Sequence, residues 1–229
     1  ALRLAPATAQ SRIDIARTLV NNLPNTCSAL ATGEISAAHA TVIAREAARV
    51  NAMHDHVKGN FTDKQGHEQS YKARDPRFLL WVHCAFTDSF LKAHLALGYP
   101  IDKGADAYVA EWSKSAVPLG LTNAPMSVAE LEATLDDFRA NDLAHVERTD
   151  EVVRFILNPP FGGAGKFFYR VIANAAIATL DQRELDLLGL TPRSKMWLRI
   201  SRICLDIFLA ILGPEPPAMQ VARERIART

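Results

Sequence analysis

His54 is the residue whose type and position could most directly support chemistry. Ile43, Ala47, Val50, His54 and Val57 recur at helical spacing, so their side chains share one face of a predicted helix. A neutral imidazole on an apolar face has a lone pair that can bind a metal ion. The alternative is a buried structural histidine that hydrogen-bonds to a carbonyl, and this is the commoner reason for a histidine on a core face.

A second predicted helix, over residues 77–97, carries His83 and Asp88. Asp88 lies about 140° around the helix from His83, so the two side chains do not share a face. Its carboxylate could pair with Lys92 four residues later, which is the structural interpretation. It could also orient a ligand imidazole that comes from another helix. Both interpretations stay open at the level of sequence.

Several other kinds of site are excluded by the motifs. The sequence has no HExxH, no ExxH and no GxSxG, which argues against a zinc protease, a ferritin-like di-iron helix pair and a serine hydrolase. The glycine-rich run 162–166 lacks the Ser or Thr of a phosphate loop, because Phe167 stands there. The three cysteines are far apart, which argues against a disulfide framework and favours a reducing compartment.

The composition is that of an ordinary globular protein. The 229 residues are 48% hydrophobic and 22% charged, which is enough to bury one large core or two small ones. The formal net charge of +1 argues against a nucleic-acid partner. The first twenty residues show no signal peptide, so we expect a cytoplasmic protein.

Four basic residues on the last predicted helix bear on membrane contact. A solvated face is the usual explanation of such charges. Peripheral contact with anionic lipid headgroups is the alternative. These residues are Arg193, Lys195, Arg199 and Arg202.

Helical periodicity and capping residues predict an all-α fold, a single bundle-like domain with an additional N-terminal helical segment. Residues 60–75 are polar and are expected to form a loop. The helices are expected over 10–32 with a break at Leu23-Pro24, from Ser36 to a C-terminal glycine at Gly59, over 76–97, 106–116, 127–140, 150–157, 167–179 and 183–188, and from Thr191-Pro192 to Leu212.

A set of short motifs follows in order along the chain: 49–59 (RVNAMHDHVKG), 71–76 (YKARDP), 79–83 (LLWVH) with Asp88-Ser89, 108–111 (YVAE), 119–120 (LG), 159–160 (PP) and 187–190 (LLGL). With these motifs, residues 49–212 resemble the family of the mpaB-type oxygenases and the rubber oxygenase (latex clearing protein) catalytic domain, many members of which are uncharacterised bacterial proteins.

The resemblance implies an oxidoreductase of the oxygenase type. Characterised relatives hold haem b through a histidine and use dioxygen to cleave the double bonds of isoprenoid chains, so the implied partners are an apolar small molecule and dioxygen. It implies that His54 is the metal ligand and that Arg49 is a second cofactor-binding residue. It implies that His83 and Asp88 are the catalytic residues.

The front of the chain departs from that family. The upstream helical segment of the family, with its His-Pro element, is not recognisable. Residues 12–50 instead resemble a helical domain of unknown function that precedes HNH nuclease modules in actinobacterial repeat-element proteins, but no nuclease motif follows. We therefore expect an N-terminal helical segment (1–48), an oxygenase-like domain (49–213) and a basic tail (214–229). The chain would be a truncated or chimeric family member. The alternative is a non-catalytic helical protein that binds a partner or an apolar ligand.

Overall fold

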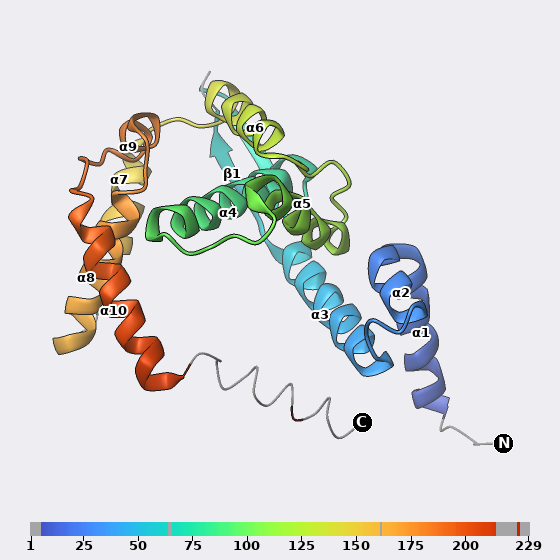
Figure 1. Cartoon of the computed structure of the whole chain (residues 1–229). Helices are drawn as coiled ribbons and strands as arrows, with labels where there is room; N and C mark the ends of the chain where they lie inside the picture. The colour runs from blue at the N-terminus through green and yellow to red at the C-terminus, as the bar shows by residue number, and fades with distance from the viewer. Residues whose placement is uncertain (1–5, 64–65, 161, 214–223, 225–229) are drawn as a thin grey trace. The chain divides into compact units, whose positions relative to one another are not determined.

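The computed structural model describes residues 6–63, 66–160, 162–213 and 224, and within these residues it is all-α apart from one small hairpin (Figure 1). The predicted fold class is confirmed. The elements are α1 (Pro6–Asn22), α2 (Pro24–Ala31), α3 (Ala37–His56), β1 (Lys58–Thr62), β2 (Glu68–Lys72), α4 (Pro76–Leu97), α5 (Gly104–Ala116), the 3-10 helix η1 (Val117–Leu119), α6 (Val128–Asn141), α7 (Glu147–Leu157), α8 (Gly163–Ile177), α9 (Gln182–Leu188) and α10 (Met196–Leu212).

The chain forms two compact units that each contain segments from different parts of the sequence. The first unit comprises residues 1–91 and 101–143, and the second comprises 92–100 and 144–229. Helix α4 contributes to both, since its last residues belong to the second unit.

Helices α1, α2 and α3 pack against one another at the start of the first unit. Leu19, Leu23, Ala40 and Ala44 are buried between them. The start of α3 was predictable, because the Ser36 hydroxyl accepts a hydrogen bond from the third backbone N–H of the helix. Small alanines on α3 let the neighbouring helices approach closely.

The prediction of an apolar face on α3 is wrong for its first and last residues, Ile43 and Val57. The buried residues are Ala40 and Ala44, whereas Ile43 is 38% exposed. Val57 is also exposed and lies beyond the end of the helix at His56. The reason is that α1 and α2 cover only the first half of α3, on the alanine side.

The prediction of a loop over residues 60–75 is also wrong, because β1 and β2 form an antiparallel hairpin there. Gly59 is a strand residue paired with Tyr71 and not the C-terminal glycine of α3. Phe61 and Tyr71 lie on the same hairpin face and form a cluster with Phe78 of α4, with ring centroids 5.3–6.3 Å apart. This aromatic cluster packs the hairpin against α4.

Helices α4, α5 and α6 enclose the main core of the first unit. The buried residues there are Leu80, Cys84, Leu91, Val109, Ala116, Leu121, Leu131, Leu135 and Phe138. Burial of a side chain such as Phe138, which is 1% exposed, contributes roughly 1.5–3 kcal/mol. The Ser127 hydroxyl caps α6 by accepting from the N–H of Glu130, and the carboxylate of Glu130 accepts from the N–H of Met126.

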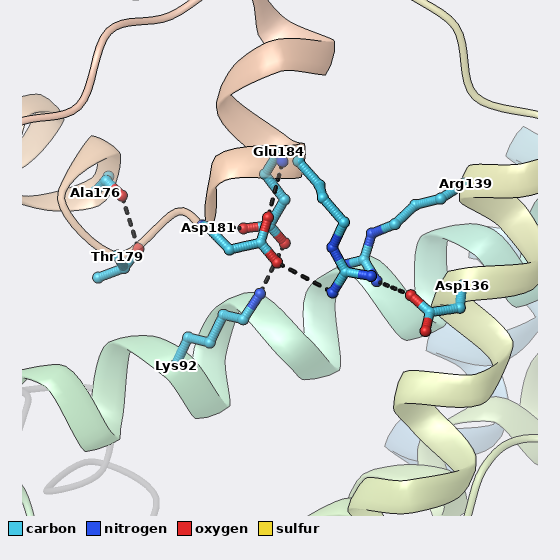
Figure 2. Close-up of polar contacts among 8 residues, drawn as sticks. Lys92, Asp136, Arg139, Ala176, Thr179, Asp181 and Glu184 are labelled. Atoms are coloured by element: carbon cyan, nitrogen blue, oxygen red, sulfur yellow. Dashed lines mark hydrogen bonds and ion pairs between the residues drawn. The ribbon is translucent and has the colours of Figure 1, made fainter.

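The second unit contains α7 to α10 and the end of α4. Asp181 and Glu184 form a reciprocal cap at the start of α9, in which each side chain accepts from the other's backbone N–H. Glu184 also accepts a hydrogen bond from the Lys92 ammonium at 2.7 Å, which ties α4 to α9 (Figure 2).

The start predicted for α10 at Thr191-Pro192 is wrong. The helix begins at Met196, where the Ser194 hydroxyl accepts a hydrogen bond from the Met196 N–H. The basic tail predicted at 214–229 lies outside the described residues except for Glu224. In the described part of the chain, no helix combines the length and the hydropathy that crossing a bilayer requires.

Candidate functional site

An apolar cavity of about 480 Å³ lies within the first unit. This volume falls in the range of small-molecule sites, roughly 300–1,000 Å³. The cavity is lined by Val50, His54, Tyr71, Ala73, Phe78, Leu79, Val82, His83, Phe86, Trp112, Ser115, Ala116, Leu119 and Leu121.

Four structural elements position these side chains. The last turns of α3 supply His54, and the hairpin with the segment after it supplies Tyr71. Helix α4 supplies His83 with several aliphatic and aromatic residues, and α5 with η1 supplies Trp112. The two histidines that the sequence singled out are thus brought together in the lining of one cavity.

His54 is half-buried, and its Nδ1 atom is fully buried without a hydrogen-bond partner. A buried polar atom without a partner costs free energy, so such an atom in a native structure calls for an explanation. The structural interpretation of His54 required a hydrogen bond from the ring to a carbonyl, and no such bond forms at Nδ1.

Asn51 fixes the end of α3 that carries His54. Its side-chain Nδ2 donates to the carbonyl oxygen of Pro118 in η1 at 3.0 Å. Since His54 lies one turn further along α3 and Leu119 follows Pro118, this bond connects two walls of the cavity. The Oδ1 atom of Asn51 is a second buried atom without a partner.

His83 lies on α4, and burial lowers the pKa of its imidazole below 6.5. The ring is therefore neutral near neutral pH and keeps a lone pair on one nitrogen. The indole of Trp112 packs against it with the ring centroids 6.4 Å apart, and Phe90 stacks on the same indole at 5.5 Å. The aromatic packing holds the imidazole in the cavity lining.

The other two predicted site residues lie outside the cavity lining. Arg49 is exposed on α3, where its Nε atom donates to the Glu46 carboxylate at 2.7 Å. Asp88 is half-buried on α4 beside Cys84. Burial and the nearby Asp88 charge raise the pKa of the Cys84 thiol to about 11, so that thiol is inert as a nucleophile. The proposed roles of Arg49 and Asp88 stay predictions.

Sequence reasoning missed Trp112 and Tyr71 as cavity residues. Tyr71 was part of a family motif, and Trp112 directly follows another, but neither shares a helix with the two histidines. Periodicity relates residues within one helix, so it gives no signal for a contact between α4 and α5. Only the packing of the helices reveals these walls.

We looked in the described residues for side chains that could together bind a metal ion. These residues contain no group of three or more His, Cys, Asp or Glu side chains placed to hold one.

The fold and the cavity define a helical protein with an apolar binding site that contains two histidines. Residues 27–208 match the sequence profile of the family described as "ER-bound oxygenase mpaB/B'/Rubber oxygenase, catalytic domain". The chain belongs to this family, as its motifs predicted, and its function is of the oxygenase kind. The match begins within the segment expected to precede the domain and includes all of α3. Searches of the curated proteins and of the solved structures gave no significant match.

Proposed function

We propose that the protein is a haem b-dependent oxygenase that cleaves the double bonds of an isoprenoid-type substrate with dioxygen. The observation that supports this most directly is the His54 ring, which lines an apolar cavity with a buried Nδ1 that lacks a partner. Family membership supports the oxygenase chemistry.

The residues present fit a haem group. A porphyrin supplies most of the ligands of its own iron, so the protein would need to offer only one imidazole. The described residues contain no cluster of three or more His, Cys, Asp or Glu side chains placed to hold a metal ion, and a haem site would not need one. An apolar cavity lies beside His54, and its predominantly aliphatic and aromatic lining supports the proposal.

In this proposal His54 would hold the haem iron through a ring nitrogen, and haem, when bound, would supply the chemistry that activates dioxygen. Val50, Phe78 and Phe86 exclude water from the cavity and contact the hydrocarbon chain of the substrate. His83 is neutral because it is buried, so it can accept or donate one hydrogen bond at the reacting end of the substrate. Trp112 keeps that ring in place.

Haem binding is tested by titration of the purified full chain with haemin, followed by its absorbance spectrum. We expect a Soret band with one haem per chain, and a reduced band in His54→Ala. His56→Ala is the matched control, because His56 is exposed on the same helix and does not line the cavity. A wild-type protein that develops no Soret band contradicts the proposal.

A second candidate function is the binding of an apolar ligand without catalysis. It is favoured by the same cavity, whose apolar lining does not by itself require a cofactor. Trp112 provides a reporter, since a ligand in the cavity would change the environment of its indole and hence its fluorescence emission. A change in emission on addition of a short polyisoprenoid, in a protein that takes up no haemin, would support this function over the first.

A further inference from the structure

The surface of α8 and α10 in the second unit is unusually apolar. The two helices pack side by side (Figure 1). Val171 and Ser201 are buried, and the Ser201 hydroxyl donates a hydrogen bond to the Val171 carbonyl. On α8, however, Phe168 and Ile172 are more than half exposed. These two side chains, with Cys204 and Phe208 of α10, line a groove of about 330 Å³ between the helices.

Helix α10 also carries an aliphatic stripe that does not face α8. Met196, Ile203, Ile207 and Ile211 lie 0, 7, 11 and 15 residues along the helix and therefore share one face. Their exposed fractions are 58, 58, 55 and 76%. Single exposed aliphatic residues are ordinary, but a stripe along four turns indicates a surface that binds something apolar.

The charges around this surface are mostly positive, with Asp206 of α10 as an acidic residue among them. Residues 156–180 contain Lys166 and Arg170 and no acidic residue. Residues 187–205 contain four basic residues, Arg193, Lys195, Arg199 and Arg202, and again no acidic one. Six positive charges and the single carboxylate of Asp206 therefore accompany the apolar surface, in a chain whose net charge is only +1.

Some of these charges lie directly beside the stripe. Arg199 is exposed and is three residues after Met196 and four residues before Ile203, so it borders the stripe along the helix. Lys195 is exposed just before the start of α10. Arg202 instead binds Asp206, with Nε to Oδ2 at 3.0 Å, and the Leu97 carbonyl.

We propose that the α8–α10 surface docks on the surface of an anionic lipid bilayer. Helix α10 would lie in the plane of the interface, with Ile203, Ile207 and Ile211 among the lipid acyl chains. Lys195 and Arg199 would contact the lipid phosphates. An apolar face bordered by Lys and Arg is the pattern of helices that bind at a membrane interface.

Charge favours a bilayer over a second copy of the chain as the occupant. A symmetric dimer through this face would bring two copies of its excess positive charge together, and like charges at short distance repel. An anionic bilayer instead attracts each exposed Lys or Arg by about 1 kcal/mol, or roughly fivefold in affinity. This inference does not depend on haem or on the proposed oxygenase activity.

The test is flotation of the full chain with vesicles of phosphatidylcholine, with and without phosphatidylglycerol. We expect binding to the anionic vesicles to exceed binding to the neutral ones and to weaken as salt is added. Lys195→Glu with Arg199→Glu should lower the affinity for anionic vesicles by about 25-fold or more. Ile203→Ser with Ile207→Ser should lower it by at least about tenfold.

Val42→Ser and Arg12→Glu are the matched controls, since both residues are exposed on helices of the first unit. Ile211→Ser provides a second variant at the most exposed stripe residue. Circular dichroism checks that each variant folds. The proposal is overturned by equal binding to neutral and anionic vesicles, by stripe variants that bind like the controls, or by a dimer in solution that binds no vesicles.

Discussion

The imidazole of His83 lies against the indole of Trp112, with the ring centroids 6.4 Å apart and the ring planes 68° from parallel. The contact joins α4 to α5 at the wall of the cavity. Phe90, two turns after His83 on α4, stacks on the same indole, with an interplanar angle of 14°. The indole of Trp112 therefore packs against two rings of α4, and this packing fixes the separation between α4 and α5.

Replacement of Trp112 by Ala should destabilise the protein by about 3 kcal/mol, because the indole loses both ring contacts and leaves a void. Trp112→Phe keeps an aromatic ring and should cost less. Urea unfolding followed by circular dichroism measures both. In Trp112→Ala water enters the cavity, so the pKa of His83 should rise toward 6.5, which NMR titration of the imidazole would detect. Equal stabilities of the Ala and Phe variants would contradict this account.

The burial of His83 predicts how stability depends on pH. The pKa of the imidazole is about 6.5 in the unfolded chain and lower in the folded protein. Between the folded-state and unfolded-state pKa values, the unfolded state therefore binds more protons than the folded state. The free energy of unfolding is therefore fully retained above 6.5 and decreases as the pH falls through the folded-state pKa.

Urea midpoints measured above and below pH 6.5 test this dependence. His83→Phe should lose less stability on acidification than the wild type, since it has no imidazole to protonate. His56→Ala serves as a control, because His56 is exposed and should leave the acid-side loss unchanged. The same pH dependence in all three proteins would show that His83 does not titrate in this way.

Helix ends that depend on nearby residues were predictable from the sequence. Ser36 caps α3, and the Asp75 carboxylate accepts from the N–H of Arg77 in the first turn of α4. Gly98 adopts a positive φ of 69° just after Leu97, the last residue of that helix. Each of these signals acts within a few residues, so no knowledge of the packing is needed.

Features that depend on distant residues were not predictable. The hairpin has weak local signals, and its pairing is supported by Phe78, which lies beyond the second strand. Within the candidate site, the helical position of His54 predicted an apolar neighbourhood, but Trp112 reaches the same cavity only through the packing of α5 on α4. Arg49 was identified from its motif alone, and its orientation away from the cavity follows from its place on α3.

Asn51→Ala should loosen the end of α3. The substitution removes the hydrogen bond to Pro118 and leaves that carbonyl without its partner, which costs about 1–3 kcal/mol. Asn141→Ala is the control, because its side chain bonds to Asp137 on an exposed helix surface, where water can replace the lost partner. Urea unfolding should therefore separate the two variants. If both cost the same, the α3–η1 bond does not stabilise the cavity wall.

Gly59→Ala should disturb the hairpin and the cavity together. A Cβ atom at this position would lie 2.6 Å from Cε1 of Tyr71, which is closer than carbon atoms can approach. The Tyr71 ring cannot move freely, because it packs against Phe61 and Phe78 and lines the cavity. We expect a loss of about 1–3 kcal/mol, as for other overpacked sites.

Gly59→Ala combined with Tyr71→Ala distinguishes two causes of destabilisation. One is a clash between the new Cβ atom and the Tyr71 ring, and the other is a requirement of the β1 backbone for glycine. If the clash with the ring is the cause, the cost of Gly59→Ala should largely disappear in the Tyr71→Ala background, because residues in contact are not additive. Thermal unfolding of the four proteins in this cycle gives the coupling energy. A cost that is unchanged in that background would mean that glycine is required for the backbone of β1 itself, and that Tyr71 does not limit the size of the residue at position 59.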